Sequence, residues 1–279
     1  SKVYILWEMS MANNESESDN EDYLLGIQID VLEETKEEAE KLRQARLFCE
    51  RLKNDAWRIS NQNIQDEGKG VHSIMAGTTS IKFSMNPELG QQFKAWDCSI
   101  VLSMYLEKFL KDNKTNPRIL ELGCGIGLPS VAAALLCPGA SVVATDLAMA
   151  QSIVEENIAL NGLNDQVSFR PFIWGGGSSL SELLEWLPFD IILCSDLIFT
   201  DAESVDKLTQ TLEECCAHGT LILSCHENRY GAQSTPYFFD RLEHKGFIRE
   251  MVGLAEVSME WQNNDRIILM KITRAPLNI

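Results

Sequence analysis

Three carboxylates stand at the ends of apolar runs, where their side chains could bind a small molecule. Glu121 lies near the end of the run 118–122, Asp146 follows a second run, and Asp196 follows a third. If these runs are parallel strands of one sheet, the three acids meet at its carboxyl edge, where open α/β sheets bind ligands. Carboxylates at such an edge form strong hydrogen bonds with cationic donors and also accept from hydroxyl groups. The positions of the acids therefore predict a site for a polar small molecule.

A glycine-rich turn, Gly-Cys-Gly-Ile-Gly, follows Glu121 over 123–127. Glycine lets the backbone turn tightly and approach a ligand without a Cβ atom in the way. A buried carboxylate costs free energy unless it meets a donor, so Glu121 favours a ligand with an ammonium group over a phosphate. The G-x-G-x-G order differs from the dinucleotide pattern, and no Gly-Lys-Ser/Thr of a nucleoside-triphosphate loop follows. A plain structural turn between a strand and a helix is the alternative.

The second acid and a later tryptophan suit the two parts of an adenosine group. Asp146 follows the glycines by roughly twenty residues, the spacing at which an acid accepts hydrogen bonds from ribose hydroxyls. Its alternative role is to cap the helix predicted over 148–160. Trp174 precedes three glycines and offers a flat face on which adenine could stack. Ordinary packing of the indole is the alternative there.

The third acid is followed three positions later by an aromatic residue, Phe199. Asp196 would lie across the site from the glycine turn, near the reacting atoms. A carboxylate beside an aromatic ring can hold an amine in line and balance the charge that develops on it. The alternative is that Asp196 caps a loop and Phe199 belongs to the core.

The segments around these residues alternate between strands and helices, which predicts an α/β fold with a mostly parallel sheet and helices on both faces. The final two strands, over 247–252 and 266–272, have no helix between them and predict an antiparallel carboxyl-terminal hairpin. An extended segment over 71–83 precedes the alternation. The other predicted strands are 118–122, 141–145, 166–172, 190–194 and 220–225, and the predicted helices are 99–110, 128–136, 148–160, 180–187, 205–216 and 237–245.

The composition argues against several classes of protein. The formal net charge is −17 over 279 residues, so the chain lacks the basic surface that general nucleic-acid binding needs. No run of about twenty apolar residues is present, which argues against a membrane span. The eight cysteines form no C-x-x-C pair, so no metal site is expected. Reduced cysteines indicate an intracellular protein, with the cytoplasm as the expected compartment and the nucleus as a second one.

The amino-terminal part differs from the rest. Positions 1–40 carry twelve Asp and Glu against two Lys, a net charge of −10. The segment 13–22 has a composition typical of disorder. The segment 33–57 has the composition of a helix, which could dock a partner or pack on the main domain. We therefore expect an acidic, partly disordered extension with one helix over 1–70, and a main domain over 71–279.

Taken in order, these segments resemble the family-16 (methyltransferase-like) group of S-adenosylmethionine-dependent protein methyltransferases, best known for methylating lysines of chaperones and translation elongation factors. The similarity covers roughly residues 83–270. It is specific to the family but not to one member. The matching segments are Trp96-Asp97 at a helix start, Glu121–Gly127 as motif I, Asp146 as the ribose acid, Trp174-Gly175 after the third strand, Ser195–Phe199 as an acid-x-x-aromatic motif, and Cys225–Tyr230 after the fifth strand.

The resemblance implies a Rossmann-like seven-strand methyltransferase sheet and S-adenosylmethionine as the cofactor. It implies N-methylation of a lysine in a protein substrate such as a chaperone or a translation factor. Separately, we expect a monomer with no nucleic-acid or membrane partner. The resemblance also implies catalytic roles for Asp196 and Phe199. The predicted cofactor-binding residues are Trp96, Glu121, Gly123, Cys124, Gly125, Asp146, Trp174 and Ser195.

Two departures from the family pattern bear on these expectations. Many relatives have Tyr at the position of Phe199, so a hydroxyl contact to the amine is missing, and arginine or histidine stays open as the acceptor. Ile173 stands where relatives often have an acid or Thr, without consequence for cofactor binding. A non-catalytic binding module with the same fold is a further alternative, against which the intact acids argue. Nucleic-acid methylation is disfavoured by the charge and by the lack of an Asn-Pro-Pro-Tyr type motif.

Overall fold

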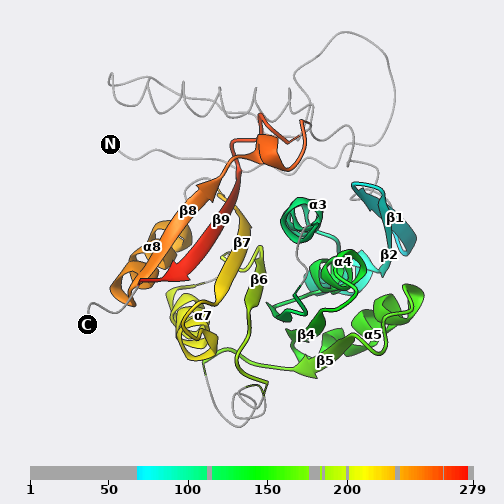
Figure 1. Ribbon diagram of the computed structural model, residues 1–279, viewed down its shortest axis with the longest axis horizontal. Coiled ribbons are helices and arrows are strands. Elements are labelled where there is room, and N and C mark those ends of the chain that lie inside the picture. The colour runs from blue at the N-terminus through cyan, green and yellow to red at the C-terminus, as the bar shows by residue number, and fades with distance from the viewer. Residues whose placement is uncertain are drawn as a thin grey trace, which may run out of the picture. The chain divides into compact units, whose positions relative to one another are not determined.

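The computed structural model describes residues 68–111, 115–175, 183, 186–198, 201–229, 233–259 and 261–275. Nearly all of the predicted acidic extension over 1–70 therefore lies outside the described residues, as does most of the helix predicted over 180–187. The described residues form an α/β fold (Figure 1). Within them, no helix combines the length and the apolar character that crossing a membrane requires.

A seven-stranded sheet forms the centre of the fold. Its strands are β3 (Arg118–Leu122), β4 (Ser141–Asp146), β5 (Val167–Pro171), β6 (Ile191–Ser195), β7 (Leu221–Glu227), β8 (Phe247–Val252) and β9 (Ile267–Arg274). Their order is β5-β4-β3-β6-β7-β9-β8, with β3 to β7 parallel and β9 antiparallel to both neighbours. This confirms the predicted parallel sheet and its carboxyl-terminal hairpin. The strand order reverses between β3 and β6, the point at which such sheets bind ligands.

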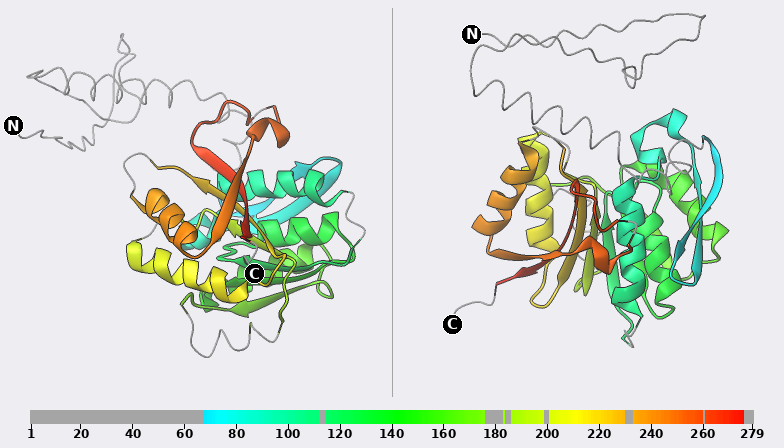
Figure 2. Two further views of the ribbon diagram at one scale, coloured as in Figure 1. Left: turned by 60° about the vertical axis from the view of Figure 1, so that its left-hand side comes forward. Right: turned by 90° about the horizontal axis from the view of Figure 1, so that it is seen from above.

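Helices cover both faces of the sheet, as predicted (Figure 2). Alternating strand residues feed two cores: Ile119 and Leu193 face the first, and Leu120 and Ile192 face the second. The helices of the first face are α3 (Asp97–Leu110), α4 (Leu128–Leu136) and α5 (Gln151–Leu160), and those of the second are α7 (Ala202–Cys215) and α8 (Ser234–His244).

A separate hairpin, β1 (Gly70–Ala76) with β2 (Thr79–Met85), lies outside the first helix layer (Figure 2). It accounts for the extended segment predicted over 71–83. The side chain of Asn157 on α5 joins the two layers: it donates to the Ser84 carbonyl at 3.1 Å and to the Ile126 carbonyl at 2.8 Å. The hairpin therefore forms a third layer over the helices.

Helix starts differ from their predicted positions. α7 begins at Ala202 and not at 205, because the Asp201 side chain accepts the Ser204 N–H at 2.9 Å and caps the helix. The helix predicted over 148–160 opens as a 3₁₀ turn, η3 (Ala148–Ala150), before α5. These differences arise from local bonds at the helix ends and leave the fold unchanged.

Candidate active site

The glycine turn connects β3 to α4 at the carboxyl edge of the sheet. Gly123 and Gly125 have φ angles of +58° and +56°, a region that strains other residues. A Cβ atom on Gly123 would lie 2.5 Å from Leu197 Cδ2 and 3.2 Å from Trp174 Cζ2, and one on Gly125 would lie 3.3 Å from the Gln92 carbonyl oxygen. Both the backbone angles and the close neighbours therefore require glycine here.

Glu121 is fully buried against the first turn of α4. Its Oε2 accepts the backbone N–H of Ser130 at 2.9 Å, one of the free donors at a helix start, and also the Ser130 hydroxyl. Its Oε1 has no hydrogen-bond partner within the described residues. Burial raises the pKa of Glu121 to about 8 despite the two bonds, and the nearby Asp146 adds to this. Ser130 thus supplies hydrogen-bond donors that the sequence analysis had assigned to a ligand. Oε1 of Glu121 is left without a partner among the described residues.

Asp146 ends β4 beside the glycine turn. Its Oδ2 accepts the Gly125 N–H and its Oδ1 the Leu147 N–H, each at 2.7 Å. Burial raises the pKa of Asp146, and these two bonds oppose the shift. No side-chain bond caps η3 or α5, so the alternative role of Asp146 as a helix cap is wrong. Each oxygen keeps a second lone pair with which it can accept a hydroxyl.

Two tryptophans flank the turn. Trp174 is half-buried and has its ring edge next to Gly123. Trp96 donates from Nε1 to the Gln91 carbonyl at 3.0 Å, and Lys94 Nζ lies 5.1 Å from its ring centroid. Gln91 belongs to the short helix η2 (Gln91–Phe93), which borders the turn. Trp174 therefore contacts the turn region directly, whereas Trp96 supports the segment beside it.

Cys124 lies inside the turn with its thiol in the first core. Its N–H donates to the Thr145 carbonyl at 2.9 Å, and its carbonyl accepts the Gly127 N–H at 2.8 Å. Burial raises the pKa of the Cys124 thiol well above its usual value, so it stays protonated at neutral pH. Cys124 therefore shapes the turn through its backbone.

Asp196 directly follows Ser195, the last residue of β6. Its φ of +54° is the one positive value among the described non-glycine residues. Its N–H donates to the Cys225 carbonyl of β7 at 2.7 Å, and the residue is 7% exposed. Asp tolerates this conformation better than most residues, and such strained positions occur often at functional sites. The second predicted catalytic residue, Phe199, lies outside the described residues.

The carboxylate of Asp196 is bound by Arg229, a residue to which the sequence assigned no role. Arg229 donates from Nη1 to Oδ1 at 3.1 Å and from Nη2 to Oδ2 at 2.6 Å, and the Glu227 N–H donates to Oδ1 at 3.2 Å. Arg229 Nη2 also lies 3.4 Å from Glu227 Oε2, and Glu227 pairs in turn with Arg266. Acidic and basic side chains thus alternate in a chain of four contacting residues, in the order Asp196, Arg229, Glu227 and Arg266. The one sequence signal was the arginine within the matching segment 225–230.

A buried histidine lies next to this network on β7. His226 is fully buried, neither ring nitrogen has a hydrogen-bond partner in the part of the chain that the structure describes, and its ring meets Phe239 edge-on at 5.7 Å. Burial lowers the pKa of His226 to about 4, which the charge of Arg229 favours and that of Asp196 opposes. The imidazole is therefore neutral at pH 7 and adds no charge to the site.

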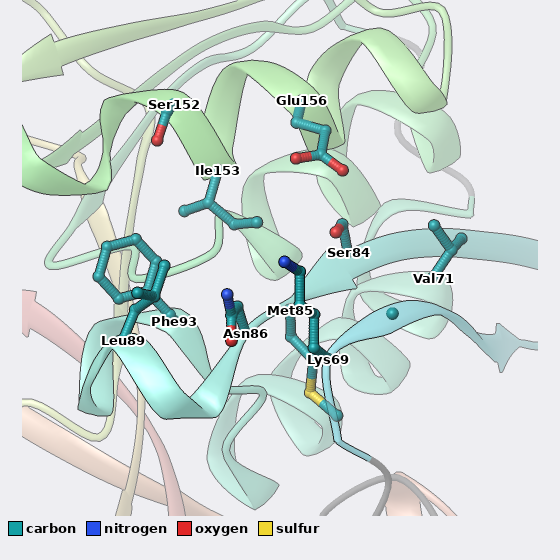
Figure 3. A pocket seen from close by; sticks show the side chains of 11 residues that line it. Lys69, Val71, Ser84, Met85, Asn86, Leu89, Phe93, Ser152, Ile153 and Glu156 are labelled. Atoms are coloured by element: carbon teal, nitrogen blue, oxygen red, sulfur yellow. The ribbon is translucent and has the colours of Figure 1, made fainter.

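A cavity of about 300 Å³ lies between the hairpin, the segment of η1 (Pro87–Leu89) and η2, and α5 (Figure 3). Ser152, Ile153 and Glu156 line it from α5, opposite Met85 and Phe93 (Figure 3). None of the predicted cofactor or catalytic residues that the structure describes is among those that line it. Across the described ranges, no group of three or more His, Cys, Asp or Glu is arranged to hold a metal ion.

Comparison with known sequences points to one family. The model of a family described as lysine methyltransferase matches residues 79–245. Protein N-lysine methyltransferase METTL21A of Xenopus tropicalis is 34% identical over 175 residues, which cover 58% of this chain and 77% of that protein. METTL21A of Mus musculus is 32% identical over 163 residues, 57% of this chain and 70% of that one. Methyltransferase-like protein 23 of Dictyostelium discoideum is 26% identical over 198 residues, 64% and 76% of the two chains.

Solved structures share the fold. SMU.776, described as a methyltransferase complexed with SAH, superimposes with a TM-score of 0.53 at 14% identity and covers 74% of this chain and 57% of that one. The chain thus spans little more than half of that structure's length. At such identity the likeness concerns the Rossmann-like methyltransferase architecture alone.

Proposed function

Because this chain belongs to the lysine methyltransferase family, we propose that its substrate is a lysine of a chaperone or a translation factor. Membership of the family makes it an S-adenosylmethionine-dependent protein-lysine N-methyltransferase. The net charge of −17 supports a protein substrate with a basic surface, because opposite charges speed encounter. We propose further that it acts as a monomer in the cytoplasm and also in the nucleus. Size-exclusion chromatography and cell fractionation test these two points.

The carboxyl edge of β3 and β4 fits the cofactor. The observation that carries the proposal is the contact of Gly125 with Asp146 at 2.7 Å, which joins the glycine turn to a carboxylate able to accept hydroxyl groups. Glu121 Oε1 offers an open acceptor for an ammonium group. Bound S-adenosylmethionine supplies the methyl group on a cationic sulfur, so the protein contributes position and electrostatics. The residues proposed to hold it are Trp96, Glu121, Gly123, Cys124, Gly125, Asp146, Trp174 and Ser195.

We assign the acceptor side to Asp196, with Phe199 as an apolar wall. A carboxylate has about four lone-pair positions, and Asp196 uses two at Oδ1 and one at Oδ2. The remaining position at Oδ2 can accept a hydrogen bond from an incoming amine. That bond orients the nitrogen for in-line attack on the methyl group, which is the main requirement of the reaction.

Transfer of label from tritiated S-adenosylmethionine to a protein extract tests this function. We expect label that is removed by protease and not by nuclease, and that amino-acid analysis recovers as methyl-lysine. Recovery as methyl-arginine or methyl-histidine would reassign the acceptor, a possibility that Phe199 leaves open. Binding of cofactor without any transfer would favour the non-catalytic alternative.

A further inference from the structure

Asp196 does not act as a lone carboxylate, because Arg229 contacts both of its oxygens. The two guanidinium nitrogens lie 3.1 and 2.6 Å from Oδ1 and Oδ2, the two-pronged geometry in which arginine binds carboxylates most strongly. Asp196 is 7% exposed, so the pair lies in surroundings where charge interactions are stronger than at an open surface. The two side chains therefore act as one unit of balanced charge.

This balance matters for an amine that must accept a methyl group. A nearby unpaired carboxylate favours the ammonium form of lysine, because opposite charge stabilises the charged state. An ammonium nitrogen has no lone pair and cannot attack. A carboxylate balanced by a guanidinium attracts the ammonium form less, yet its open lone pair at Oδ2 still accepts a hydrogen bond from the neutral amine.

We propose that Arg229 is a positioning residue, which clamps Asp196 and keeps the acceptor lysine neutral for methyl transfer. The proposal rests on the function proposed above and deepens it. Arg229 acts through Asp196: it fixes the direction of the open lone pair and cancels the charge that would hold a proton on the amine. Glu227 also lies 3.4 Å from Arg229, but Arg266 pairs with Glu227 and offsets its charge, so the two acids and two bases together stay balanced.

Two titratable groups beside the pair, His226 and Cys98, carry no charge at neutral pH. His226 is neutral, since burial lowers its pKa to about 4. On α3, burial raises the pKa of Cys98 well above its usual value, so it remains a thiol. The other groups near the pair are Cys225 and Glu227 of β7 and Arg266 ahead of β9, and Asp97 of α3 acts on Cys98.

The test is the pH dependence of methylation by Arg229→Gln, with the full chain, tritiated S-adenosylmethionine and a protein extract as acceptor. Without the guanidinium, Asp196 should hold a proton on the amine. We expect the initial rate at about pH 7 to fall about tenfold and the rate–pH curve to move up by about one unit, so that activity largely returns near pH 9. Affinity for S-adenosylhomocysteine, measured by calorimetry, should stay within about twofold of the wild type, because Arg229 lies on the acceptor side.

Two further variants control for lost charge and lost structure. Arg229→Lys keeps the positive charge but not the two-pronged guanidinium contact. We therefore expect a rate a few-fold lower than that of the wild type, with an unchanged rate–pH curve. Arg241→Gln removes the same charge from another arginine–aspartate pair, in which Arg241 Nε lies 2.7 Å from Asp206 Oδ1, and should leave the curve unchanged.

A rate for Arg229→Gln that is unchanged, or reduced equally at every pH, would overturn the proposal. If Arg229→Gln binds no S-adenosylhomocysteine, it has lost its fold and Arg229→Lys becomes the test. A rate–pH curve displaced in Arg229→Lys, which keeps the positive charge, would then refute the inference. A wild-type enzyme that labels no lysine would instead refute the proposed function, and the inference with it.

Discussion

The two sides of the site are held by different kinds of contact. On the proposed cofactor side, Glu121 and Asp146 accept backbone N–H groups of Ser130 and Gly125. On the proposed acceptor side, Asp196 is held mainly by the side chain of Arg229, which lies in the segment directly after β7. Backbone donors are set by the fold, whereas a side-chain donor can change without altering it. The proposed cofactor side is therefore fixed by the backbone, whereas the proposed acceptor side depends on a side chain that a substitution can change.

The largest expected effect comes from Asp196→Asn. Asn tolerates the φ of +54° and keeps the shape, but it removes the charge and one acceptor oxygen. Loss of one preorganised electrostatic partner typically costs about 10²–10³ in rate. We expect methylation to fall by that factor while calorimetry shows cofactor affinity changed by only a few-fold. A near wild-type rate would mean that Asp196 is structural and that the two sides do not divide as described.

Asp146→Ala should show the reverse pattern. It removes the carboxylate that is proposed to accept the ribose hydroxyls and that already holds Gly125. We expect cofactor binding to weaken by about 1.5–3 kcal/mol, the value of hydrogen bonds to a charged group. Saturating cofactor should restore most of the rate, in contrast to Asp196→Asn. Failure of excess cofactor to restore it would place Asp146 on the acceptor side as well.

Gly123→Ala tests whether close packing, and not only the backbone angle, defines the cofactor side. Its Cβ would lie 2.5 Å from Leu197, whereas a Cβ on Gly162, with φ of +70°, would meet nothing within 4 Å. Both variants strain the backbone by about 1 kcal/mol or more. We expect Gly123→Ala to lower the free energy of unfolding by about 1–2 kcal/mol beyond Gly162→Ala, in urea titrations. Equal losses would show that the φ angle alone matters.

The smallest effect concerns protons on Glu121. Its pKa of about 8 in the free protein means that the carboxyl group is mostly protonated at pH 7. Binding of an ammonium group requires the ionised form, so binding should release part of a proton, and affinity should rise by less than about tenfold from pH 7 to pH 8. Calorimetry with S-adenosylhomocysteine in two buffers of different ionisation enthalpy measures the release. Glu121→Gln, which carries no such proton, should show none, and an equal release from it would remove Glu121 from the site.

The same proton on Glu121 also affects the free energy of unfolding, which falls as the pH rises, whereas the affinity for the ligand rises. The pKa of Glu121 is raised from 4.5 to about 8, so the folded state keeps a proton that the unfolded chain releases. The stability linked to this group is fully present below about pH 4.5 and is lost as the pH rises through about 8.

The sequence predicted the parts of this molecule whose signals are local. Alternating apolar runs predicted the sheet, and the glycine turn and Asp146 stand together because consecutive parallel strands end at one edge. The partners of the acids were not predicted. Ser130 reaches Glu121 because of where α4 begins, and Arg229 reaches Asp196 because Ser195 is in register with Cys225. Such pairings depend on three-dimensional alignment, which composition and spacing do not encode.

The hairpin of β1 and β2, which forms the third layer, also has a consequence for folding during synthesis. α4 is buried over nearly its whole length, from Leu128 to Ala134, between the sheet, its neighbouring helices and β2. An apolar helix of this kind would associate with other chains if it were left uncovered. The hairpin precedes it in the sequence and leaves the ribosome first. The cover of this apolar helix is therefore synthesised before the helix itself, which suits vectorial folding during translation.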